Sequence, residues 1–159
     1  MSEEVGEKAG ENSGNAVEVK IEDLVLVVGN MNRFLALLAS SKAFSTAEVS
    51  LADWLILSTV SGRNTATPNQ LIKLLGVAPQ RVSQIVERLK DKQLLAKGGA
   101  TPHSLSLTER GSGLIGRLNA DILDILSVGL NGRERSLVAV ERHLRSLIQV
   151  FTPAKSKAN

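Results

Sequence analysis

Two short amphipathic segments separated by a single glycine place the tightest constraint on the fold of this chain. The first, Pro68–Leu75, starts with proline at the first helical position, and Thr67 with Gln70 forms the pattern of a capping box. Gly76 follows, and glycine is the residue best able to take the left-handed conformation that ends a helix. Pro79–Lys92 is the second segment. We therefore expect two helices joined by a tight turn.

Apolar residues occupy the positions that would lie between these two helices. Such residues fix the crossing of a helix-turn-helix motif because they point from each helix toward the other. They are Leu71, Leu75, Val77, Val82 and Ile85. Ile72 departs from the pattern, because many such motifs carry a small residue there. The sequence predicts a helix-turn-helix with Pro79–Lys92 as its second helix.

The face of Pro79–Lys92 opposite the core is polar and suits contacts with DNA. At 100° per residue, Gln80 and Gln84 point away from the predicted core. Glutamine can form a bidentate contact with adenine and arginine with guanine, and the major groove, about 12 Å wide, admits a helix. The alternative is an ordinary polar surface helix. The predicted DNA-binding residues of the two helices are Thr67, Asn69, Ala78, Pro79, Gln80, Arg81, Ser83, Gln84 and Arg88.

Within this set we expect different kinds of contact. Arg81, Ser83 and the two glutamines are predicted to lie near bases, and Arg88 near a phosphate. Thr67 and Asn69 begin the first helix, whose N-terminal amides could bind another phosphate.

Positive charge is concentrated around the same segment. The whole chain has a formal net charge of +3, but residues 1–20 are net acidic. The stretch Arg63–Arg110 carries eight basic and three acidic residues. A locally basic segment is the footprint expected of a phosphate binder, although a solvated lysine-rich surface explains it equally well.

Helices are predicted on both sides of this segment. Residues 1–19 are poor in large apolar groups, so we expect a disordered acidic tail. Apolar residues recur at helical spacing over Ile21–Ser40, in a stripe broad enough for burial against more than one neighbour. Ser50 and Asp53 predict a capped helix from Leu51 to about Val60, and the residues between these two helices are expected to be a short link.

A small hairpin and two further helices are predicted after the second amphipathic helix. Leu94–Lys97 and His103–Leu107 suit short strands joined by a turn. Thr108 is expected to cap a long helix, and Asn131 to cap a last one. That last helix has apolar residues at alternating spacings of three and four, typical of a helix–helix contact.

The order of these elements resembles that of the MarR family (multiple antibiotic resistance regulators) over nearly all of residues 21–151. The similarity is most specific in Val77–Leu89 (VAPQRVSQIVERL) and Leu105–Gly111 (LSLTERG). It implies a mainly α (α+β winged helix) fold with about six helices and a two-stranded β wing. It also implies DNA recognition by Pro79–Lys92, a wing that touches the minor groove, and a dimer built from the first and last helices.

The resemblance divides the chain into one domain with two tails. Residues 20–151 would form the domain, in which 50–108 are the winged helix-turn-helix lobe. The dimerisation helices would lie in 20–42 and 109–151, and 152–159 would be a flexible tail. The wing turn departs from the family because it lacks the usual arginine, which leaves Lys97 and His103 as candidates for phosphate contact.

The composition speaks against catalysis and against a metal or cofactor. Cysteine is absent, and His103 and His143 lie on different elements. Gly111–Gly116 fits the letters of a dinucleotide-binding fingerprint but lacks a parallel sheet before it. Asp121 and Asp124 are interpreted as solvated charges. No nucleophile, base and orienter can be nominated, so we expect no enzyme. No uncharged apolar stretch approaches the roughly 20 residues needed to span a bilayer, so we expect no membrane span and a cytoplasmic location.

The resulting functional prediction is a homodimeric, sequence-specific DNA-binding transcriptional regulator, a repressor of palindromic operators. The family resemblance implies a small-molecule effector site, which Met31, Phe34 and Trp54 could line, although packing explains these residues as well. One alternative is a winged-helix adaptor or antagonist that binds protein and does not contact DNA directly. Another is an enzyme or small-molecule carrier that uses the space between the dimer helices and the DNA-binding lobe.

Overall fold

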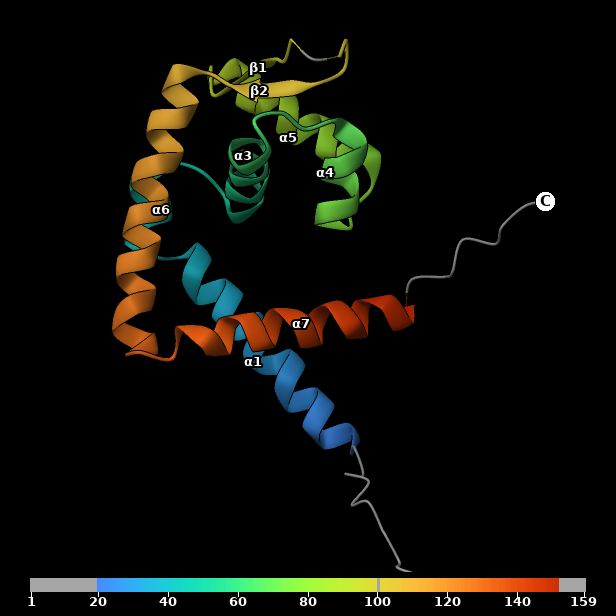
Figure 1. Cartoon of the computed structure of the whole chain (residues 1–159), viewed down its shortest axis with the longest axis vertical. Helices are drawn as coiled ribbons and strands as arrows, with labels where there is room; N and C mark the ends of the chain where they lie inside the picture. Colours follow the sequence, from blue (N-terminus) through green and yellow to red (C-terminus); the bar gives the residue numbers. More distant parts are fainter. Residues whose placement is uncertain (1–19, 100, 152–159) are drawn as a thin grey trace, which may run out of the picture. The chain divides into compact units, whose positions relative to one another are not determined.

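A computed structural model of the chain describes residues 20–99 and 101–151, which form seven helices and two strands (Figure 1). The predicted tails, 1–19 and 152–159, lie outside the described residues. In chain order the elements are α1 (Ile21–Ala39), α2 (Lys42–Ala47), α3 (Leu51–Arg63), α4 (Pro68–Leu75), α5 (Pro79–Asp91), β1 (Leu95–Lys97), β2 (Leu105–Leu107), α6 (Glu109–Leu130) and α7 (Glu134–Phe151). The mainly α fold with a two-stranded β wing is confirmed, with one helix more than predicted.

The chain separates into two units, and the first, up to Leu37, contains most of α1. This helix has the predicted position and the predicted broad apolar stripe. Its apolar side chains from Ile21 to Leu37 are exposed, and Leu38, where the second unit starts, is buried.

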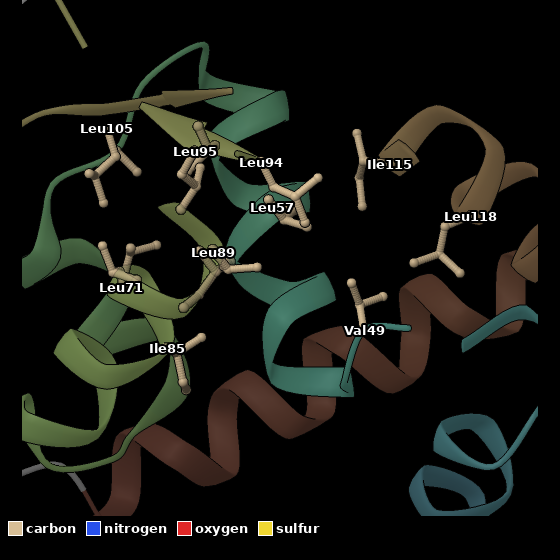
Figure 2. Close-up of a cluster of buried hydrophobic side chains, with 14 of the residues drawn as sticks. Val49, Leu57, Leu71, Ile85, Leu89, Leu94, Leu95, Leu105, Ile115 and Leu118 are labelled. Atoms are coloured by element: carbon tan, nitrogen blue, oxygen red, sulfur yellow. The ribbon is translucent and has the colours of Figure 1, made fainter. Parts of the chain in front are cut away.

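The second unit holds the hydrophobic core, which α3, α4, α5, α6 and the hairpin share (Figure 2). Each helix contributes its apolar stripe: Leu57 comes from α3, Leu71 from α4 and Leu89 from α5, and all three are fully buried. Ile115 and Leu118 bring α6 against the same cluster. The helix-turn-helix therefore rests on a core that extends well beyond its own two helices.

The two strands form an antiparallel hairpin that is tied to the helix-turn-helix. Leu95 pairs with Leu107 and Lys97 with Leu105. Ala66, two residues before α4, forms an isolated bridge with Leu105, in which the two backbone N–H groups donate to the opposite carbonyls at 3.0 and 2.8 Å. The strands are shorter than predicted, because Leu94, His103 and Ser104 lie outside them.

The structure corrects three local predictions. The segment before α3, predicted as a link, contains α2, and Phe44 anchors this short helix in the core. Asn131 is not the N-cap of the last helix: it takes the left-handed conformation that asparagine tolerates and ends α6, so α7 begins at Glu134. Val77, predicted as a core residue, is 39% exposed, because the turn after Gly76 carries it out of the space between the helices.

One glycine of the LSLTERG segment is required by a close approach of α6 to the base of the wing. A Cβ on Gly111 would lie 2.2 Å from the carbonyl oxygen of Leu94, far inside van der Waals contact. Thr108 fastens the same junction: its Oγ1 accepts from the N–H of Gly111 at 2.9 Å and donates to the carbonyl of Gln93 at 2.6 Å. The glycine-rich stretch therefore has a packing role at this position.

Gly111→Ala is expected to lower the free energy of unfolding by about 1–3 kcal/mol, because the new methyl group overlaps backbone atoms that cannot move freely. Gly116→Ala is the matched control on the same helix, since a Cβ added there would meet no atom within 4 Å. It should raise stability by about 0.5–1 kcal/mol through helix propensity. Urea unfolding of both variants measures this, and equal stabilities would contradict the packing role.

Candidate nucleic-acid interface

The recognition helix α5 is divided cleanly into a buried face and an exposed face. Its apolar residues Val82, Ile85, Val86 and Leu89 are buried. Gln80, Arg81 and Gln84, predicted to lie near bases, are exposed. The predicted orientation of the helix is therefore confirmed, and its exposed side chains are arranged as contact with a DNA groove requires.

Local sequence determines where the two helices of the motif begin and end. The capping box before α4 is confirmed, with the N–H of Thr67 donating to Oε1 of Gln70 at 2.9 Å. Gly76 ends α4 in the left-handed conformation, with φ of 62° and its N–H donating to the carbonyl of Ile72 at 2.9 Å. Pro79 is the first residue of α5. The turn is thus held by backbone geometry, which fixes how α5 is presented.

The remaining predicted residues at the start of each helix are accessible to differing degrees. Asn69, Ala78 and Pro79 are exposed and Thr67 is half-buried. Ser83 is exposed, but its hydroxyl donates to the carbonyl of Pro79 at 3.2 Å. In this conformation the Ser83 oxygen can act only as an acceptor toward a ligand.

Arg88 is engaged within the protein, a contact that the sequence did not predict. Its Nη2 donates to Oδ1 of Asp53 at 2.5 Å, and the Asp53 side chain is only 4% exposed. Oδ2 of the same carboxylate accepts from the N–H of Ser50 at 2.8 Å, which completes the predicted capping box of α3. Asp53 therefore joins the start of α3 to the recognition helix.

The wing and α5 enclose a groove of about 310 Å³ on the same side as the recognition helix. Lys97 and His103, the predicted phosphate contacts of the wing, both line it, and both are exposed. Ser83, Glu87 and Lys90 line it from α5. The structure therefore brings the wing candidates and part of α5 to one surface.

The charges of this groove are partly compensated. Lys90 donates to Oε1 of Glu87 at 2.9 Å, which neutralises one lysine. Within residues 20–99 and 101–151, Arg81 and Lys97 form no ion pair. Both side chains are exposed, so each offers an uncompensated positive charge, one on α5 and one on the wing.

The wing turn is short and internally bonded. The N–H of Gly98 donates to the carbonyl of Ser104 at 2.7 Å, and the buried Ser104 hydroxyl donates to the carbonyl of Thr101 at 2.9 Å. Ala100 lies outside the described residues. Because the described residues of the wing include no arginine, Lys97 and His103 are the candidates within the wing for contact with DNA by a basic side chain.

The predicted effector-site residues fall in different units. Trp54 is half-buried against the core: its indole N–H donates to Oδ1 of Asn119 at 2.7 Å, and its ring packs edge-on against Phe44 with centroids 6.0 Å apart. Met31 and Phe34 belong to the first unit, on α1. The pocket stays a prediction, and packing accounts for Trp54.

The described residues hold neither a metal-binding cluster nor a membrane-spanning helix. No group of three or more histidine, aspartate or glutamate side chains lies close enough to hold a metal ion within this part of the chain. Of the helices in the same residues, none has the length and apolarity to cross a bilayer.

Comparison with known proteins agrees with this geometry. The model of the MarR family matches residues 48–103, which include α3, the helix-turn-helix and the start of the wing. Among curated proteins, none matches the chain significantly by sequence. The resemblance predicted from the sequence is confirmed for this segment.

Solved structures extend the similarity to the fold of most of the chain. A MarR/EmrR family transcriptional regulator from Acinetobacter is 21% identical, covers 82% of this chain and 99% of its own, and has a TM-score of 0.65. A MarR family protein of Mycobacterium tuberculosis, solved in complex with DNA, is also 21% identical, with 82% and 98% covered and a TM-score of 0.59. A second structure of the same Mycobacterium tuberculosis protein, in complex with p-aminosalicylic acid, is 20% identical. It covers 81% of this chain and 98% of its own, with a TM-score of 0.58.

Proposed function

Since residues 48–103 of this chain are a MarR family module within a MarR winged-helix fold, we propose that the protein is a homodimeric, sequence-specific DNA-binding transcriptional regulator. The observation that carries this proposal is the exposed polar face of α5, with Gln80, Arg81 and Gln84 free of the core. Those residue types form bidentate contacts with adenine and guanine in the major groove. A fold neighbour solved with DNA supports the same use of the fold.

The path of the DNA follows from the position of the groove between α5 and the wing. With α5 in the major groove, Lys97 and His103 lie beside it, where they can contact the phosphate backbone. The short wing then contributes little base recognition. Sequence preference therefore resides mainly in Gln80, Arg81 and Gln84.

Dimerisation is supported by an exposed apolar face on α7. Leu137, Val140, Leu147 and Ile148 are between 44% and 63% exposed, although the helix is strongly amphipathic. Leu144 joins Leu137, Val140 and Ile148 in lining a shallow apolar groove. A monomer rarely leaves such a stripe in water, whereas two copies related by a two-fold axis can cover it. The exposed apolar residues of α1 fit the same role.

A two-fold dimer predicts the form of the binding site. Two recognition helices that enter successive major grooves lie about 34 Å apart, so the operator is a palindrome. Occupation of a palindromic operator by a compact dimer would block transcription, and we propose repression as the mode of action. A small-molecule effector would adjust this binding, as the complex of a fold neighbour with p-aminosalicylic acid suggests.

The proposal is tested by selecting bound sequences from a random duplex library with the full-length protein. The expected result is an enriched palindrome with half-sites one helical turn apart. Enrichment of no sequence, together with no binding to any duplex at low salt, would rule out DNA recognition and favour the alternatives that do not contact DNA.

Arg81→Ala and Gln84→Ala are expected to weaken binding to the selected operator by about 1–3 kcal/mol each, because each removes a base contact. Preference for the contacted base pair should fall at the same time. Arg117→Ala is the control: it removes one exposed charge from α6, away from the recognition helix. Titration of labelled operator at several salt concentrations measures the effect, and a loss as large in Arg117→Ala would contradict the assignment.

A further inference from the structure

The recognition helix is fastened to the rest of the lobe at its C-terminal end by two polar contacts. The first is the bond from Arg88 Nη2 to Asp53 Oδ1, at 2.5 Å. The second runs from Nζ of Lys92 to the backbone carbonyl of Glu48, at 2.7 Å. Glu48 directly follows α2, and Asp53 lies in the first turn of α3. The end of α5 is therefore held in place by side chains as well as by the apolar core.

Asp53 is the unusual member of these contacts, because it is a carboxylate with a 4% exposed side chain. A buried charge is costly unless it is paired and hydrogen-bonded. Here Oδ2 is satisfied by the N–H of Ser50, a bond that a neutral asparagine oxygen could also accept. The bond to Ser50 therefore does not require the negative charge of Asp53. The charge instead favours the bond between Oδ1 and the guanidinium of Arg88.

Arg88 keeps most of its donors free. A guanidinium has five N–H groups in a planar fork, and only one Nη is bonded to Asp53. The side chain is 48% exposed, so its outer edge faces solvent. Along α5, Arg88 follows Gln84 by four residues and Arg81 by seven, so the three share one face of the helix. The outer edge of Arg88 therefore continues the surface proposed to contact DNA.

We infer that Asp53 is a positioning residue for DNA binding, which holds Arg88 so that its free N–H groups can donate to a backbone phosphate. This inference rests on the proposed DNA binding. The N-terminal residues of a recognition helix lie over the bases, so the last turn, where Arg88 lies, is close to the sugar-phosphate chain. A guanidinium already fixed by Asp53 loses less side-chain entropy when it binds the phosphate.

The direction in which Asp53→Asn changes the affinity for DNA distinguishes a positioning role from a purely electrostatic one. Asp53→Asn removes a negative charge near DNA, so electrostatics alone predicts tighter binding. Positioning predicts the opposite: about three- to tenfold weaker binding, because Arg88 must be ordered at the moment of binding. For Asp53→Asn, the slope of the logarithm of the binding constant against the logarithm of the salt concentration should stay near that of the unmodified protein, because Arg88 keeps its charge. Asp91→Asn on the exposed side of α5 is the matched control, with equal or tighter binding expected.

The experiment uses the full-length chain and two probes, the selected operator and a random-sequence duplex at low salt. Phosphate contacts carry no sequence information, so Asp53→Asn should weaken both complexes in the same proportion. Arg88→Met should weaken both and reduce the salt slope by about 0.9 per protomer bound. The double variant Asp53→Asn/Arg88→Met should bind no more weakly than Arg88→Met alone, since Asp53 acts through Arg88.

Equal or tighter binding by Asp53→Asn would overturn the inference while leaving DNA recognition intact. Absence of binding by the unmodified protein to either duplex would instead remove the proposed function itself. Should Asp53→Asn not give the circular dichroism spectrum of a folded protein, Arg88→Lys provides the second arm. Lysine keeps the charge but lacks the fork that can join a carboxylate to a phosphate. We expect it to bind about three- to tenfold more weakly, and affinity equal to that of the unmodified protein would overturn the inference.

Discussion

Leu144→Glu on α7 is expected to convert the proposed dimer to a monomer and to lower affinity for a palindromic operator by about 10²- to 10⁴-fold. Leu144 lies in the apolar groove of α7, where a carboxylate would be desolvated in a two-fold interface beside its own symmetry mate. A monomer still presents α5, but its second half-site contact is no longer intramolecular. The loss should therefore exceed that of any single contact on α5. Sedimentation and operator titration on the same samples measure both effects.

Ser146→Glu is the control for this experiment, because it adds the same charge to the same helix. At 100° per residue, position 146 lies about 200° from Leu144, on the side of α7 away from the apolar stripe. It should leave both the mass and the operator affinity unchanged. The dimer hypothesis fails if the unmodified protein sediments as a monomer, or if Leu144→Glu remains a dimer.

The helix-turn-helix could be predicted from the sequence because its signals are local. The capping box of Thr67, the left-handed Gly76 and Pro79 at the first position of α5 act within a few residues of where they stand. The periodicity of α5 then fixed which face is buried. This is why the exposure of Gln80 and Gln84 was predictable before any tertiary contact was known.

The features that the sequence did not reveal depend on distant partners or on context. The helix α2 has only six residues, too few for a periodic pattern, and is held mainly by Phe44 in the core. Asn131 suits either end of a helix, and only the path of the chain decides that it ends α6. The helix-turn-helix pattern predicts Val77 as a core residue, but the turn exposes it.

The candidate site shows the same division. The helical spacing of α5 predicts that its glutamine and arginine side chains are exposed. The contact between Arg88 and Asp53 was not predictable in this way, because it joins residues 35 positions apart. Asp53 already had a sufficient local explanation as the capping-box partner of Ser50. Its ion pair with Arg88 has one weak signal in the sequence: the capping carboxylate lies beside the apolar residues of α3, where burial is expected. Spacing along one helix cannot supply the partner of a buried charge on another.

Arg88→Met is expected to lower the free energy of unfolding by about 3 kcal/mol, independently of any DNA. The substitution leaves the Asp53 carboxylate buried at 4% exposure without its cation, and breaking a buried ion pair in this way costs about 3–5 kcal/mol. The low end applies because Arg88 is half exposed, so water can replace part of its contact.

Two further variants isolate the unpaired charge as the cause of this loss. Adding Asp53→Asn to Arg88→Met should restore most of the stability, because the neutral amide no longer needs a cation while its oxygen still accepts from Ser50. Arg81→Met, an exposed arginine of the same helix, should change stability by less than about 0.5 kcal/mol. Urea unfolding of the unmodified protein, Arg88→Met, the double variant and Arg81→Met measures these changes. If the double variant is no more stable than Arg88→Met, the loss comes from packing of the arginine stem, and the ion pair is not what holds the end of α5 to α3.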